Sequence, residues 1–188
     1  MQIVSFAEAE VPDGLRAQVR DLQESAWPTG TAPDVVHDPA LKPLSMLLVD
    51  GDVVVAALDI LQKQLDHAGT SFLAGGLSTV VTRADRRGRG HGRQLILAAR
   101  STMLEQGLDL GIFTCDRPLR IFYESAGWQP LRGTVLIGGT PADPFPSDLP
   151  GFDKVTLAAF FTPKAQQAEP TFHKARIPLH PGTIDKLW

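Results

Sequence analysis

The segment from Arg83 to Arg93 constrains the fold of this chain more than any other part of the sequence. Its glycines, Gly88, Gly90 and Gly92, alternate directly ahead of a stretch that is expected to be helical, residues 93–106. Glycine lets backbone N–H groups converge on an anion, and the first turn of a helix adds unpaired donors and a positive dipole end. Because three glycines are otherwise a poor start for a helix, the segment predicts a phosphate-binding turn between a strand and a helix.

The charge of the chain is distributed unevenly around this segment. Residues 83–93 contain five arginines and one acid, so their formal charge is +4, whereas the whole chain carries −3 and the remainder therefore −7. A general nucleic-acid binder spreads positive charge over a whole face, and no aromatic residues are interleaved with these arginines. The pattern indicates a local anion site and predicts no nucleic-acid partner.

Two familiar phosphate motifs do not fit. The chain has no Gly-Lys-Ser or Gly-Lys-Thr, which excludes the nucleoside-triphosphatase loop. Arg93 stands where the dinucleotide fingerprint that starts at Gly88 requires a third glycine.

Length and composition favour a single domain with a tail. With 188 residues, 43% of them hydrophobic, the chain can bury a core over residues 1–162, and residues 163–188 are expected to form an extended tail packed on that domain. The longest apolar run, Val53–Leu58, is too short to cross a membrane, and no signal peptide is recognisable. The single cysteine, Cys115, excludes an internal disulfide and is expected to be a buried structural thiol. The expected setting is cytoplasmic, without membrane contact.

The predicted order of elements is that of an α+β fold. Asp50-Gly51-Asp52 joins the apolar runs 44–49 and 53–61 into an antiparallel hairpin, and a third strand, 71–81, leads to the arginine-glycine segment. The second half then alternates strands and helices. The remaining expected elements are strands over 2–6, 110–114, 131–138 and 155–162, helices over 12–26 and from Asp116 to Gly127, and a proline-rich loop over 141–150.

Two motifs resemble the signatures of the GNAT acetyltransferase superfamily. Arg87-Gly-Arg-Gly-His-Gly92 is similar to its Arg/Gln-x-x-Gly-x-Gly/Ala pattern, and Ile121-Phe-Tyr-Glu-Ser-Ala-Gly-Trp128 is similar to its aromatic-Tyr-Glu-x-x-Gly-aromatic run. The gap between them has room for one helix and one strand, as that fold requires. The resemblance implies a GNAT-type mixed, mostly antiparallel, twisted sheet flanked by helices. It also implies direct transfer of an acetyl group from acetyl-CoA to a primary amine.

The resemblance further implies which residues bind acetyl-CoA. The pyrophosphate would lie on the backbone amides of residues 88–92, and the pantetheine arm would pair with the end of the third strand as an added strand. Asp116 stands where many family members have an asparagine that touches the cofactor, and a helix cap is its alternative role. The residues expected to bind the cofactor are Val80, Val81, Thr82, Arg87, Gly88, Arg89, Gly90, His91, Gly92, Arg93 and Asp116.

Tyr123 is the only tyrosine in the chain, and it stands where the family uses a tyrosine as general acid for the departing thiolate. It also lies on an apolar helical stripe with Leu119, Phe122 and Ala126, so packing is the alternative role. The five histidines show no metal-ligand spacing, and we predict no metal.

A narrower resemblance is to the aminoglycoside 2'-N-acetyltransferases, through the hairpin, the arginine-glycine run, Asp116-Arg117 and a final tryptophan. This chain has Ser78 where that subfamily carries a glutamate, and residues 74–81 contain no carboxylate to act as the base. Ser78 is a catalytic candidate because it can hold a water that relays the proton. The alternative bases, which as a set would make an acidic pocket for a cationic substrate, are Asp34, Asp143, Asp148, Asp153 and the carboxylate of Trp188. The candidates for substrate binding are Asp34, Thr79, Asp148, Asp153 and Trp188.

The alternative function is an acyl-CoA-binding module without turnover, which the missing strand glutamate motivates. Burial of Tyr123 away from the thioester would favour it, and an acetylated product would exclude it. The expected partner is a small-molecule amine such as an aminoglycoside, and a homodimer is compatible with the sequence.

Overall fold

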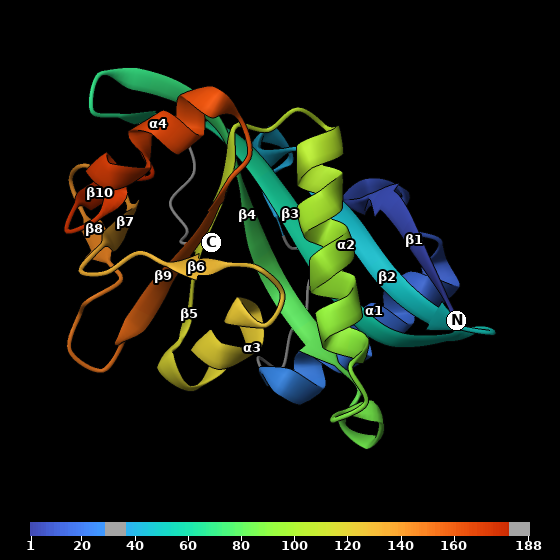
Figure 1. Cartoon of the computed structure of the whole chain (residues 1–188). Coiled ribbons are helices and arrows are strands. Elements are labelled where there is room, and N and C mark those ends of the chain that lie inside the picture. The colour runs from blue at the N-terminus through green and yellow to red at the C-terminus, as the bar shows by residue number, and fades with distance from the viewer. Residues whose placement is uncertain (29–36, 181–188) are drawn as a thin grey trace.

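The computed structural model describes residues 1–28 and 37–180 and confirms the predicted fold class. Seven strands form one sheet in the order β1-β2-β3-β4-β5-β9-β6, antiparallel except for the β4–β5 pair, and a small second sheet has the order β10-β7-β8 (Figure 1). The strands are β1 (Gln2–Ala7), β2 (Leu44–Asp50), β3 (Val53–His67), β4 (Thr70–Thr82), β5 (Leu110–Asp116), β6 (Gln129–Pro130), β7 (Val135–Gly139), β8 (Pro144–Pro146), β9 (Lys154–Phe160) and β10 (Arg176–Pro178). The helices are α1 (Asp13–Ala26), α2 (His91–Glu105), α3 (Arg120–Glu124) and α4 (Pro163–Phe172). Within the described ranges, no helix is long and apolar enough to cross a membrane.

Helices cover both faces of the large sheet because side chains alternate along its strands. Met46 and Leu48 of β2 belong to the larger core, whereas Leu47 and Val49 belong to a smaller core on the other face. The larger core takes residues of α2, namely Leu95, Ile96, Ala99 and Met103. The smaller core takes the predicted apolar stripe of α1, namely Leu15, Val19, Leu22 and Ala26.

The long hairpin of β3 and β4 contains a β-bulge near the end of β4. Asp59 pairs with Ser78, but two residues earlier on β3 the partner is already three residues further along β4, at Val81. One extra residue is therefore inserted into β4, and Thr79 takes up a positive φ of 50°. The bulge bends β4 just ahead of the arginine-glycine segment.

The parallel strands β4 and β5 pair over a short distance and then separate. Their register within the described residues has two positions, the second of which is Gly75 with Gly111. β4 nevertheless continues to Thr82 and β5 to Asp116, and the two strands diverge in Figure 1. The two strands therefore splay apart beyond this pair, and we call the region between their second halves the wedge.

Residues 163–172 correct the expectation of an extended tail, because they form α4. Thr162 caps this helix by accepting a hydrogen bond from the Ala165 backbone at 3.3 Å, and Pro163 occupies its first turn. The prediction failed because the segment has no clear apolar period and contains Pro170. Phe172 at the end of α4 is fully buried against the rings of Phe72 and Phe160.

Two segments between α3 and β9 also differ from the sequence expectation. The strand expected over 131–138 is β7, which begins at Val135 and lies in the second sheet. The proline-rich stretch 141–150 contains β8, which pairs with β7.

The helix expected from Asp116 is a single 3-10 turn followed by the short α3.

We expect the Gly111→Ala substitution to destabilise the protein by about 1–3 kcal/mol through overpacking. A Cβ at this position would lie 2.6 Å from two ring carbons of Trp128, and that ring is fully buried and cannot move aside. The control is Gly14→Ala in α1, where a Cβ meets nothing within 4 Å. It should leave stability unchanged or raise it by up to about 1 kcal/mol. Urea denaturation of both variants measures the difference, and equal midpoints would contradict this account of the β4–β5 contact.

Candidate active site

The turn after β4 has the backbone that a bound anion requires. Gly88 and Gly90 have positive φ angles of 73° and 83°, and Gly90 is the N-cap of α2, which starts two residues earlier than predicted. A Cβ on Gly92 would lie 2.9 Å from Thr82 Oγ1 and 3.1 Å from the Phe122 ring, so only glycine allows this close approach. The positive end of α2 thus faces the mouth of the wedge.

Two arginine side chains of this segment donate hydrogen bonds to the surrounding backbone. Arg87 Nε donates to the carbonyl of Thr82 at 3.1 Å, which holds the turn against the end of β4. Arg93 Nε donates to the carbonyl of Ser125 at 2.9 Å, which ties the start of α2 to the end of α3. Two arginine-to-carbonyl hydrogen bonds therefore fix the turn, one to β4 and one to α3, and its positive charge lies at the protein surface.

Tyr123 lies on α3 and packs into the larger core against the sheet. Its side chain is 5% exposed and packs edge-on against Phe113 at 5.0 Å between ring centroids. Burial, together with the neighbouring Cys115 and Asp116, raises the pKa of Tyr123 well above its ordinary value. Burial also raises the pKa of the Cys115 thiol to about 11, as expected of a structural rather than a reactive cysteine.

Asp116 does not cap a helix, contrary to its alternative sequence role. The 3-10 turn that follows it has no side-chain cap, and the carboxylate instead accepts from Lys154 Nζ at 2.5 Å. Lys154 comes from β9, beside β5 in the sheet. The ion pair thus joins the end of β5 to β9, its neighbour on the side away from β4.

The proposed acidic side chains are engaged separately rather than gathered around Ser78. Asp153 accepts two hydrogen bonds from Arg117, at 2.8 and 2.5 Å, and Asp148 accepts two from Arg176, at 2.8 and 3.3 Å. Asp143 lies in an exposed turn before β8. Asp34 and Trp188 lie outside the described residues.

A buried chain of hydrogen bonds meets β4 at Ser78. The Nε2 atom of His37 lies 2.9 Å from Ser78 Oγ, and its Nδ1 lies 3.2 Å from Glu8 Oε1. The backbone N–H of His37 donates to Glu8 Oε2 at 3.3 Å. In a neutral ring, Nδ1 is the donor to Glu8, since an ionised carboxylate only accepts hydrogen bonds, and Nε2 then accepts from the Ser78 hydroxyl; in a protonated ring, both nitrogens donate. Glu8 and His37 are 6% and 8% exposed, whereas Ser78 is half-buried.

The bulge beside Ser78 is held by a buried carboxylate on β3. Asp59 is 4% exposed and accepts hydrogen bonds from the hydroxyls of Ser45 and Thr79. Burial raises its pKa, although the positive charge that His37 carries when protonated and the two hydroxyl donors counteract this effect. Oxygen and nitrogen atoms of Glu8, His37 and Asp59 lie within 4.8 Å of one another. Hydrogen bonds engage both nitrogens of the His37 ring and both Asp59 oxygens, and we refer to Glu8, His37 and Asp59 as the polar network.

Sequence reasoning missed the three residues of this network that lie outside β4. Asp59 carried a signal, since it is the one charged residue within the apolar run 53–61. Glu8 and His37 carried none, because His37 lies 41 residues from Ser78 along the chain and no local pattern connects them. The Ser78 hydroxyl, expected to hold a water, forms a hydrogen bond with His37.

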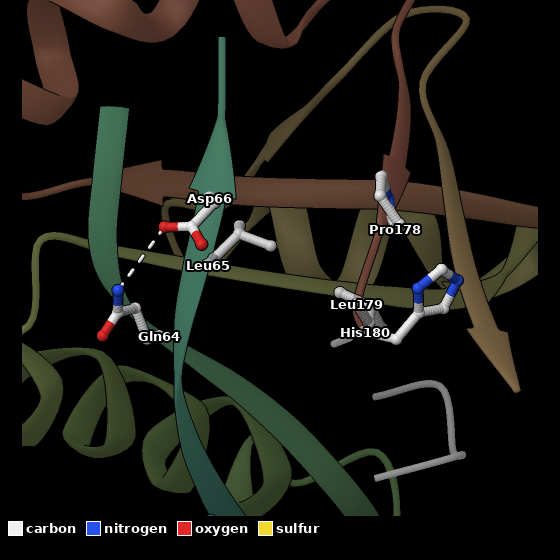
Figure 2. A pocket seen from close by; sticks show the side chains of 6 residues that line it. All are labelled: Gln64, Leu65, Asp66, Pro178, Leu179 and His180. Carbon is white, nitrogen blue, oxygen red and sulfur yellow. Dashed lines mark hydrogen bonds between the residues drawn. The ribbon is translucent and has the colours of Figure 1, made fainter. Parts of the chain in front are cut away.

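A separate pocket of about 260 Å³ lies at the other end of the hairpin (Figure 2). It is formed by the end of β3 and the segment after β10, with Leu65 and His180 among its lining residues. Gln64 on β3 pairs with Leu73, near the start of β4, whereas Ser78 and the arginine-glycine turn belong to its other end. This pocket is therefore distinct from the wedge.

Comparison with known proteins agrees with this geometry. A family model described as an acetyltransferase (GNAT) domain matches residues 11–131, which include β4, the glycine turn, α2 and α3. A search of curated proteins found no match to the chain.

Solved structures share the fold at low sequence identity. Escherichia coli ElaA is 17% identical, with a TM-score of 0.58 over 84% of this chain and 99% of that chain. An aminoglycoside 6'-N-acetyltransferase complexed with coenzyme A is 16% identical, with a TM-score of 0.59 over 87% of this chain and 98% of that chain. The aminoglycoside 6'-N-acetyltransferase from Enterococcus faecium is 17% identical, with a TM-score of 0.59 and the same coverage of 87% and 98%.

The burial of Tyr123 predicts an unusual titration, which is simple to follow because the chain has one tyrosine. In the folded protein, phenolate absorbance should be missing at the ordinary tyrosine pKa of about 10, and guanidinium-unfolded protein should titrate there. Since the folded-state pKa is the higher one, this contribution to stability is complete below about pH 10 and is lost as the pH rises through the folded-state value. Ultraviolet titration that gave the same midpoint in both states would contradict the buried environment.

Proposed function

This chain belongs to the GNAT acetyltransferase family and is an acyltransferase, and we propose that it moves the acetyl group of acetyl-CoA directly to a primary amine of a small cationic molecule. The observation that carries this proposal is the wedge between β4 and β5, which leads from the bulge at Thr79 to the glycine turn. An extended thioester arm and a pyrophosphate need these two features next to each other.

The donor would lie along the β4 edge of the wedge. The pantetheine arm pairs with the backbone of Val80, Val81 and Thr82 as an added strand, because this stretch has no partner on β5. The pyrophosphate rests on the backbone amides of residues 88–92 at the start of α2. The side chains of this turn, Arg87, Arg89, His91 and Arg93, add positive charge at the rim, and Asp116 borders the mouth from β5.

In the reaction, the amine nitrogen attacks the thioester carbonyl and the thiolate of coenzyme A leaves. Backbone N–H groups at the bulge are suited to stabilise the oxyanion that forms. Tyr123 is protonated before the reaction and gives its proton to the thiolate, although burial raises its pKa and makes it a weaker acid. The same raised pKa disfavours a lasting phenolate, so a proton from the amine must restore the phenol within the same turnover.

A cationic acceptor agrees with the acidic remainder of the chain and with two of the structural relatives, which are aminoglycoside acetyltransferases by name. Thr79 faces the acceptor side of the bulge in this proposal, and Asp148 and Asp153 supply negative charge. Both carboxylates form ion pairs with exposed arginines, and exposed pairs of this kind contribute about 0–1 kcal/mol. They can therefore open to a polyamine or aminoglycoside at little cost.

Gly90→Ala should weaken the binding of acetyl-CoA about tenfold or more, because an alanine resists the positive φ that aims the turn at the pyrophosphate. Gly69→Ala is a matched control, since Gly69 has a φ of 75°, equally open surroundings and a position in the distant β3–β4 turn. Both variants lose similar stability, but only Gly90→Ala should lose affinity. In wild type, acetyl-CoA at about 100 times Kd should stabilise the fold by about 2.7 kcal/mol, measured by thermal unfolding. Equal affinities in the two variants would contradict the proposed donor site.

The function itself is tested by thiol release from acetyl-CoA over a panel of aminoglycosides, polyamines and neutral amines. We expect turnover with at least one cationic amine and about a 100-fold lower kcat in Tyr123→Phe, with the affinity for acetyl-CoA retained. Unchanged turnover in this variant would remove Tyr123 as the acid. Acetyl-CoA binding without turnover over the whole panel would contradict the proposed acceptor class.

A further inference from the structure

A cationic acceptor amine carries a proton that it must lose before it can react. An amine of the lysine type has a pKa of about 10, so it is protonated near neutral pH and must lose a proton before its lone pair can attack. The β4 strand has no carboxylate from Ala74 to Val81 that could accept this proton. A basic group from another element must therefore reach the bulge.

His37 is such a group, because it stands directly behind Ser78. Its ring is buried and held at both nitrogens, with Ser78 Oγ at 2.9 Å on one side and Glu8 Oε1 at 3.2 Å on the other. The second Glu8 oxygen accepts from the His37 backbone, which fixes the carboxylate as well. A hydroxyl, an imidazole and a carboxylate in this order allow a base to be reached through the hydroxyl and a third group to orient the base.

We propose that Ser78, His37 and Glu8 form a proton relay for the acceptor amine, in which Ser78 touches the amine, His37 receives the proton and Glu8 positions His37. This inference rests on the proposed function and names the group that deprotonates its acceptor. It also assigns a role to two N-terminal residues that lie far from β4 in the sequence.

Each of the three ammonium protons has a destination in this reaction. The ammonium gives one proton to Ser78 Oγ while the Ser78 hydroxyl proton passes to His37 Nε2, which leaves imidazolium beside Glu8. The freed lone pair forms the C–N bond, and the C–S bond breaks with its electron pair on sulfur. The thiolate takes the Tyr123 proton, and the second amine proton restores the phenol. The products are the amide, the free thiol and one proton on His37, which returns to solvent.

Two acidic groups lie beside His37, where the relay places a positive charge. Glu8 is the nearest, and Asp59 on β3 is the other acidic group of the cluster. Glu8 is the principal counter-charge because its Oε1 contacts the ring at Nδ1, whereas both Asp59 oxygens accept from hydroxyls. From α1, the Arg16 guanidinium donates to the backbone carbonyl of Glu8 at 3.2 Å and holds this turn in place.

The test is the pH profile of His37→Gln with saturating acetyl-CoA and the best amine of the panel. Near neutral pH, we expect kcat to fall about 100-fold with KM for acetyl-CoA unchanged. The deficit should shrink as the pH approaches the amine pKa of about 10, because solvent then removes the proton. Ser78→Ala and Glu8→Gln should show the same pH-dependent pattern, and a merely structural role would give a deficit that does not change with pH.

Matched controls are His67→Gln at a half-buried position and Ser71→Ala and Glu10→Gln at exposed positions, all outside the relay. All three should keep wild-type profiles. Wild-type kinetics in His37→Gln would overturn the relay while leaving the proposed function intact, whereas a wild-type enzyme without turnover would count against the proposed function. Loss of wild-type activity in EDTA, or a trapped acetyl group on Ser78, would overturn the relay as well.

A measurement that needs no turnover reads the hydrogen bonds themselves. In ¹⁵N-labelled protein, the His37 ring should be the Nδ1–H tautomer, with Nε2 as the acceptor from Ser78. Ser78→Ala should shift the Nε2 resonance and Glu8→Gln the Nδ1 resonance, with circular dichroism as the check on folding. An Nε2–H tautomer in the wild type would overturn the relay, because the ring would then donate to Ser78 and could not take its proton.

Discussion

The early end of hydrogen bonding between β4 and β5 is the constraint on which the rest of this structure depends. The strands approach closely at Gly75 and Gly111, where Met103, Leu108 and Trp128 fill the space that a side chain would need. Beyond that point each strand keeps one partner, β3 or β9, and loses the other. Backbone donors and acceptors are left along two diverging edges inside a sheet, which is costly unless something extended pairs with them. The wedge is therefore a consequence of how these strands pack.

The bulge in β4 is maintained by an interaction that a simple core would not contain. Asp59 is buried, and burial of a carboxylate is unfavourable unless its oxygens are hydrogen-bonded. Both are, to hydroxyls of Ser45 and Thr79. Thr79 in turn holds the positive φ that turns β4 and leaves the adjacent Ser78 against His37. Asp59 thus couples the bulge in β4 to the position of the Ser78 hydroxyl.

Local patterns in the sequence predicted most of the fold, including the glycine turn that is proposed to bind the donor. The Asp-Gly hairpin, the alternating glycines and the helix behind them each depend on neighbours within a few residues, and the structure has all three. The network of Glu8, His37 and Asp59 could not be found in this way, because three elements that are distant in sequence bring it together. α4 was missed for a different reason: its stability depends on burying Phe172, whereas Pro170 and a weak apolar period conceal it.

The place of β9 in the sheet has a consequence for how the protein forms during synthesis. β9 lies between β5 and β6, and its residues are made some forty positions after those of β5. The β5 wall of the wedge therefore has no outer partner until most of the chain has left the ribosome, and Phe172 completes the core later still. Pairings of such long sequence separation form slowly, since a large loop must close before they contribute. The strand pairing that completes the β5 wall of the wedge is thus expected to form late, and the outer edge of β5 is unpaired in a nascent chain in the meantime.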